Sequence, residues 1–160
     1  METDFANIEG MFKINTDIVK KAIADIVPEH WFLKPGDDSN HLMWVAGHLV
    51  VHRGAVLKSL GAEWETSWSS LFTRGAKLVA QDEYPGVETI QNAWDDVSGK
   101  LLTSLSGVPT DALTKPAPKG PPSFDGKISG LVAFLAFHET YHVGQVSYLR
   151  KWLGYGQSVG

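Results

Sequence analysis

The sequence of 160 residues contains no cysteine, so disulfide bonds, thiolate metal ligands and a cysteine nucleophile are all excluded. It has no run of about 18 apolar residues, and its start, METDFANIEG, lacks the basic and apolar regions of a signal peptide. Lysine and arginine form no block and the net charge is −4, so we expect neither nucleic acid nor a membrane as partner. The sequence predicts a cytoplasmic protein that would use histidine for any soft-metal site.

The composition is that of a globular protein, with 43 % apolar and 20 % charged residues. The length predicts a single domain over residues 1–160. Apolar residues recur at helical spacing in four segments, and no segment of useful length shows the alternation of a strand. The four segments are 4–27, 42–60, 87–107 and 128–153. This pattern predicts an all-α four-helix bundle.

Two long connections join the last three predicted helices. Residues 62–85 contain Trp64, Trp68 and Phe72, so we expect them to pack on the bundle as a cap or short helix. The length of this segment also permits a crossover along the bundle. Residues 106–126 contain five of the eight prolines, which predicts a stiff extended segment rather than a helix.

The last predicted helix contains the sequence HETYH, in which His138 and His142 interrupt an apolar seam. Residues four apart lie on one helix face, so both imidazoles are expected to point into the bundle. Two basic rings in an apolar seam need partners for their nitrogens, and a metal ion satisfies both. The second predicted helix carries His48 and His52, and His41 lies seven residues before His48; one of these would complete a three-histidine site with an open position.

HETYH also fits the H-E-x-x-H pattern of zinc proteases, in which the glutamate is the base. After His142, however, the chain contains no histidine, aspartate, glutamate or cysteine to act as a downstream ligand, and no sheet is predicted to align a peptide. A metalloprotease is therefore the least favoured metal function. Glu139 lies about 100° around the helix from His138, so it is a candidate base, a residue that orients a ligand, or a surface residue.

Four further residues are candidates for the pocket or for contacts to the ligands: His52, Gln145, Tyr141 and, in the seam of the first helix, Asn15. Each has a structural alternative. Tyr141 can serve aromatic packing or a dimer face, and Gln145 can form a bond between helices.

The segments HLMWVAGHLVVHR and FHETYHVGQVSYLRKWLG resemble those of the DinB-like superfamily of four-helix-bundle metal proteins. The resemblance implies that His48, which ends a W-x-x-G-H segment, binds a divalent metal together with His138 and His142. It also implies an up-down-down-up bundle and a homodimer. The activities that it implies are a transferase using a low-molecular-weight thiol or a hydrolase, acting on a small-molecule substrate. Histidine-only sites suit zinc, nickel and iron.

Two other classes of function remain open from the sequence. A non-catalytic, stress-related module would use the metal for stability, with a closed shell completed by His52, Glu139 or another side chain. A protein-interaction bundle would carry an inert histidine cluster. An enzyme instead requires an open metal position beside a pocket, which we expect between the helices and residues 62–85.

Overall fold

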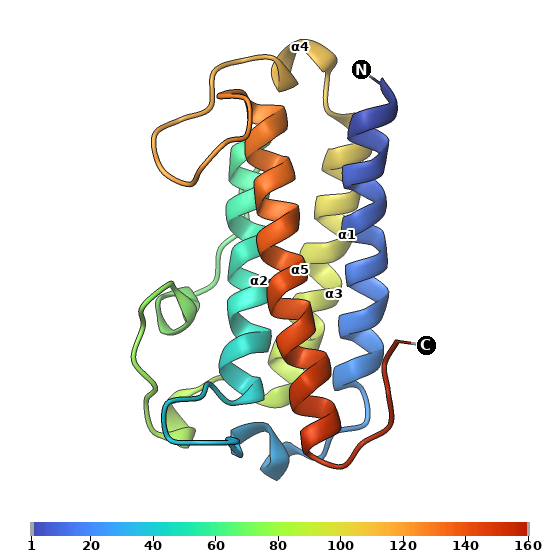
Figure 1. Cartoon of the computed structure of the whole chain (residues 1–160). Coiled ribbons are helices and arrows are strands. Elements are labelled where there is room, and N and C mark those ends of the chain that lie inside the picture. Colours follow the sequence, from blue (N-terminus) through green and yellow to red (C-terminus); the bar gives the residue numbers. More distant parts are fainter. Residues whose placement is uncertain (1, 160) are drawn as a thin grey trace.

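Four long helices dominate the computed structural model, which describes residues 2–159, with side chains from residue 5 onward (Figure 1). They are α1 (Glu2–Ile23), α2 (Leu42–Ser59), α3 (Val87–Gly107) and α5 (Ile128–Trp152). The connections contain the single turn α4 (Thr110–Leu113) and the short 3-10 helices η1 (Pro28–Phe32), η2 (Ser69–Phe72) and η3 (Gln81–Glu83). No strand occurs between residues 2 and 159, where β pairing is limited to one isolated bridge. The predicted all-α class is confirmed.

The long helices lie side by side, each against two others. α1 packs on α3 and α5, and α2 packs on the same two helices. Near the start of α3, Gln91 Nε2 donates to Ile23 O at the end of α1 at 2.9 Å, so these helices are antiparallel. At the end of α5, Arg150 Nη1 donates to Ala22 O at 2.9 Å, so α1 and α5 are parallel. Figure 1 shows α2 and α3 running together in the opposite direction.

The apolar seams of the four segments form the core, and α2 is the most enclosed helix. Every residue from 41 to 50 is buried, because α3, α5, η1 and η2 all pack against α2. Three polar side chains of α2 are therefore inside the molecule: His48, His52 and Arg53. No helix in the described range 2–159 has both the length and the apolar character that crossing a membrane requires.

One predicted helix boundary and one predicted conformation are wrong. α1 ends at Ile23, before the predicted end at Val27. Proline disfavours a helical conformation in the residue before it, and Val27, which precedes Pro28, is extended with φ −62° and ψ 144°. The proline-rich connection 106–126 is not extended throughout, because α4 begins directly after Pro109.

The connection between α2 and α3 packs on the bundle, as its aromatic residues predict. Phe72 is fully buried and lies over Gly47, where a Cβ atom would come within 2.3 Å of the Phe72 ring. Seven residues later on the same face of α2, a Cβ atom at Gly54 would lie 2.9 Å from the backbone oxygen of Trp64. The absence of side chains at Gly47 and Gly54 therefore lets this connection lie directly against α2.

Candidate metal centre

Three histidines from two helices meet between α2 and α5. α2 contributes His48, and α5 contributes His138 and His142, which are about one helical turn apart. One ring nitrogen of each lies within 4.8 Å of the other two. The Nε2 atoms of His138 and His142 are 3.2 Å apart. The structure thus brings together the three side chains that the sequence and the resemblance point to as ligands.

The outward ring nitrogens of two of these histidines are held by acceptors. His48 donates from Nδ1 to the backbone oxygen of Phe72, and His142 donates from Nδ1 to Oε1 of Gln145, each at 2.7 Å. A carbonyl oxygen only accepts, so the proton of each neutral ring lies on Nδ1 and Nε2 carries a lone pair. The two acceptors therefore orient both rings with Nε2 toward the cluster.

The third ring is held by another histidine. His52 donates from Nε2 to the backbone oxygen of Leu135 at 3.0 Å, so its Nδ1 is an acceptor. This Nδ1 lies 3.3 Å from Nδ1 of His138, which donates to it and keeps its own Nε2 free. His52 thus contacts the outward side of His138, and both of its ring nitrogens are engaged, one by Leu135 and one by His138.

Three lone pairs directed at one centre suit a cation. If Nδ1 of His138 and Nδ1 of His142 carry the ring protons, as their hydrogen bonds indicate, the two Nε2 atoms face each other as lone pairs, an arrangement that a cation relieves. Two nitrogens at about 2.0–2.1 Å from a tetrahedral ion lie about 3.3 Å apart, close to the observed 3.2 Å. Neutral imidazoles are ligands for zinc, nickel and iron. The residues fit a divalent metal, and within residues 2–159 the cluster offers three ligands.

Burial keeps the imidazoles neutral. It lowers the pKa of His48 to about 4, although the hydrogen bond to Phe72 acts in the opposite direction. Burial also lowers the pKa values of His138 and His142, and it holds the pKa of His52 well below the usual value of 6.5. At neutral pH, protons therefore compete little with a metal for the Nε2 atoms.

Trp44 covers one face of His48. The two rings stack with their centroids 4.9 Å apart and their planes 8° from parallel, because residues four apart are neighbours on a helix face. The indole Nε1 of Trp44 is the one buried side-chain nitrogen or oxygen in the described part of the chain that lacks a partner. The sequence did not predict that Trp44 or the Phe72 carbonyl contacts His48. For Trp44 the spacing of four residues before His48 could have indicated the contact.

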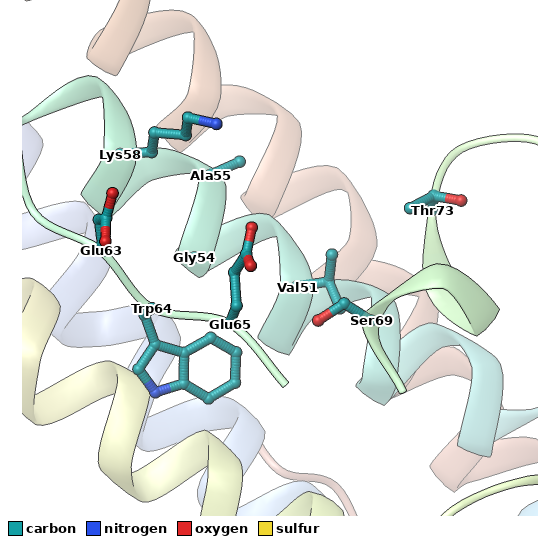
Figure 2. A pocket seen from close by; sticks show the side chains of 9 residues that line it. All are labelled: Val51, Gly54, Ala55, Lys58, Glu63, Trp64, Glu65, Ser69 and Thr73. Carbon is teal, nitrogen blue, oxygen red and sulfur yellow. The ribbon is translucent and has the colours of Figure 1, made fainter. Parts of the chain in front are cut away.

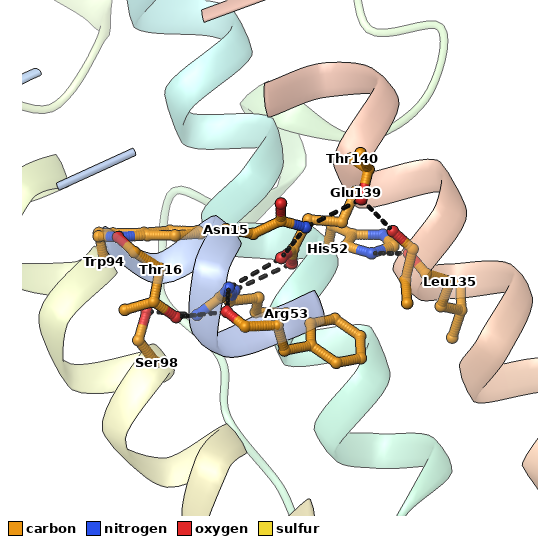
Figure 3. Close-up of polar contacts among 11 residues, drawn as sticks. Asn15, Thr16, His52, Arg53, Trp94, Ser98, Leu135, Glu139 and Thr140 are labelled. Carbon is orange, nitrogen blue, oxygen red and sulfur yellow. Dashed lines mark hydrogen bonds and ion pairs between the residues drawn. The ribbon is translucent and has the colours of Figure 1, made fainter. Parts of the chain in front are cut away.

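Glu139, the candidate base, is bound in an ion pair outside the histidine cluster. Arg53 donates from Nε to Oε2 of Glu139 at 2.9 Å and from Nη2 to Oε1 at 2.8 Å (Figure 3). Neither side chain has exposed surface. Asn15, the candidate pocket wall, donates to Oε1 of Glu139 at 3.2 Å and so belongs to the same buried network. Glu139 and Asn15 thus take part in a buried polar connection between helices.

The remaining candidates lie beside the cluster. Gln145 contacts His142 through the hydrogen bond that orients its ring. The Tyr141 side chain is 61 % exposed, and its ring stands edge-on to His142 with the centroids 5.2 Å apart. The other two histidines, His30 and His41, bond to different groups.

A groove of about 460 Å³ runs along α2 (Figure 2). Val51, Gly54 and Ala55 of α2 line it together with Trp64 from the following connection. Its other lining residues are polar: Lys58, Glu63, Glu65, Ser69 and Thr73. Thr73 directly follows Phe72, so this end of the groove lies beside the residue whose carbonyl holds His48, while none of the three histidines lines the groove itself.

Known protein families give an independent view of the chain. The family model of the DinB superfamily matches residues 11–146, a range that includes all three histidines of the cluster. The chain belongs to the DinB superfamily. Both segments that carry the resemblance start within the matched range, so the resemblance is confirmed. No curated protein matches the sequence significantly. Membership in the DinB superfamily and the close histidine triad are together compatible with a metal-binding protein.

Proposed function

We propose that this DinB superfamily protein binds a divalent metal through His48, His138 and His142 and uses it to transform a small-molecule substrate. The observation that carries the proposal is that Nδ1 of each ring has a hydrogen-bond partner, from which it follows that three Nε2 lone pairs remain. A transferase that uses a low-molecular-weight thiol, or a hydrolase, is the type of enzyme proposed. When bound, a divalent metal supplies a Lewis acid that lowers the pKa of a coordinated water or thiol.

The chain's own residues hold the ligands in place and shape the approach to them. The Phe72 carbonyl, Gln145 and His52 fix the orientation of the three rings. Trp44 covers a face of His48 and keeps water from it. The groove along α2 receives the substrate. Glu139 serves the fold through Arg53 in this proposal rather than moving a proton.

The contacts of the two predicted fourth ligands favour a catalytic metal over a structural one. A structural site is closed by four protein ligands. His52 is engaged at both ring nitrogens, and the carboxylate of Glu139 is bound by Arg53. The same ion pair argues against a protease of the H-E-x-x-H type, which would need Glu139 as its base.

We also infer the up-down-down-up order for the bundle and a single domain over residues 1–160. A parallel pair of consecutive helices, α2 and α3, requires a connection that returns along the bundle. Residues 60–86 supply such a connection (Figure 1). The buried apolar residues of the long helices form one continuous cluster, which supports the single domain.

Metal content and coordination test the proposed function. Protein purified without a histidine tag should contain close to one equivalent of zinc, nickel or iron per chain by elemental analysis. After cobalt replaces the metal, azide should change the visible absorption spectrum, because a small anion can take an open position. A cobalt spectrum that neither azide nor thiols alter would favour the structural metal. A metal-free protein whose melting is unchanged by chelator would favour the inert bundle.

We infer further that the exposed face of α5 forms a homodimer. Phe137, Tyr141, Tyr148 and Trp152 are 59, 61, 61 and 43 % exposed and follow one another at helical spacing. Gly144 lies within this stripe, and nothing lies within 4 Å of the position that its Cβ would take, so a second helix can approach closely.

Light scattering should therefore give twice the mass of one chain. Tyr148→Glu places a charge in the stripe and should yield monomers. Ile14→Glu is the matched control, because Ile14 is also 61 % exposed but lies on α1. A monomeric wild-type protein at about micromolar concentration, or a dimer that survives Tyr148→Glu, would contradict the proposed interface.

A further inference from the structure

The groove along α2 carries charges of both signs that do not pair with each other. Lys58, Glu63 and Glu65 all line it, yet none of them has an ion-pair partner within 4.0 Å among the described residues. Figure 2 shows the Lys58 ammonium and the two carboxylates around the same opening. One ammonium and two carboxylates in one place offer partners to a ligand group that itself carries both charges.

One end of the groove lies beside Phe72, the residue that holds His48, and the groove extends from there along α2. Val51, Ala55 and Lys58 follow His48 at intervals of three, four and three residues, so all four lie on one face of the helix. Thr73 lines the end of the groove next to the Phe72 carbonyl that holds His48. Lys58 is ten residues after His48, or about 15 Å along the helix axis. The two ends of the groove therefore differ in chemistry.

The middle of the groove is apolar. Val51 and Ala55 present only carbon atoms, Gly54 has no side chain, and the Trp64 indole stands beside them (Figure 2). Trp64 donates its Nε1 hydrogen to Asp96 at 2.7 Å, so its ring is held in place and offers a fixed face to a ligand. A hydrocarbon or aromatic segment of a ligand would bury its surface here.

We propose that this groove binds the substrate of the metal site, an elongated molecule with a metal-binding donor at one end, an apolar middle and an α-amino acid group at the other end. The carboxylate of that group pairs with Lys58 and its ammonium pairs with Glu63 or Glu65. This inference rests on the proposed function. A nucleotide or another polyanion fits poorly, because Glu63 and Glu65 would repel its phosphates.

Two hydroxamates of equal length test this assignment, because a hydroxamate binds the metal whatever its other end carries. One probe ends in an α-amino acid group and the other in an alkyl group, each with an extended length of about 15 Å. Titration of each into the cobalt-loaded full-length protein, followed by visible absorption, gives the two affinities. We expect the amino acid probe to bind about 5- to 20-fold more tightly, a modest gain because the pairs are exposed to water.

Substitutions locate the source of this preference. Lys58→Met should remove most of the preference without changing the affinity for the alkyl probe. Lys21→Met is the matched control, since Lys21 is an exposed lysine on α1, outside the groove, and this variant should bind like the wild type.

The experiment distinguishes a failure of the groove assignment from a failure of the proposed metal site. Equal affinity of the wild type for the two probes, or a preference that survives Lys58→Met, overturns the assignment of the groove and leaves the metal site standing. A protein that does not load cobalt overturns the proposed function itself.

Discussion

Replacing His138 by alanine should lower the affinity for zinc by more than about 100-fold, since removing a partner of a ligand already costs 10- to 100-fold. The substitution removes one of three ligands, and it also leaves the buried Nδ1 of His52 without its donor. A chelator-competition titration measures the affinity, and circular dichroism of the metal-free variant shows whether the helices remain. Unchanged metal affinity in a folded variant would remove the three-histidine assignment.

Variants of two other histidines should lower the zinc affinity less than His138→Ala does, or not at all. His52→Gln should lower the zinc affinity by about 10- to 100-fold, because His138 stays a ligand but loses the acceptor that orients it. His30→Asn should leave the affinity unchanged, because His30 bonds to the hydroxyl of Tyr155 at 3.0 Å and is no member of the cluster. If His52→Gln were as damaging as His138→Ala, His52 would be a ligand in its own right.

The histidine pair on α5 was predictable because its signal is local. A spacing of four within an apolar seam requires only that the segment be helical, and α5 is helical over the whole pair. The third ligand depends on how two helices are placed against each other, which periodicity does not determine. From the residues alone His41, His48 and His52 all remained open, and the resemblance selected His48, which the structure brings to the pair.

The groups that hold the ligands and the neighbouring Glu139 could not be predicted from the sequence. The carbonyl that holds His48 belongs to Phe72 in a connection, and connections have no periodic pattern from which a backbone position can be inferred. Arg53 follows His52 and resembles a surface residue in the sequence. Because α2 is apolar and buried on almost every side, its pattern gave no sign of which way Arg53 points. For Glu139 the H-E-x-x-H pattern suggested a base, whereas its partner lies 86 residues away.

Removing one partner of the Arg53–Glu139 ion pair should destabilise the protein more than any surface substitution. All the polar atoms of the Arg53 guanidinium bond within the protein, and two of them hold Glu139. Its other acceptors are Phe12 O and Thr16 Oγ1 on α1 and Ser98 Oγ on α3. The guanidinium carbon also lies 3.9 Å from the centre of the Trp94 ring. Arg53 thus connects α2 to the three other long helices (Figure 3).

Glu139→Ala should therefore lower the free energy of unfolding by about 3–5 kcal/mol, because it leaves a buried guanidinium without its counter-charge. Urea denaturation of the metal-free protein, followed by circular dichroism, measures this loss. Asp95→Ala is the control: Lys20 and Asp95 are 2.9 Å apart but 61 and 50 % exposed, and removing such a surface pair should cost at most about 1 kcal/mol.

The double replacement Arg53→Met with Glu139→Gln separates an unpaired charge from a general loss of packing. Without a buried charge, the double variant should be more stable than Glu139→Ala, although it loses the bonds to three helices. Zinc affinity should follow the same order, because His52–His138 and Arg53–Glu139 are consecutive pairs between α2 and α5 and share one alignment of these helices. Equal urea midpoints for Glu139→Ala and the wild type would show that the ion pair is not buried in solution, and the alignment of the histidines would then need another cause.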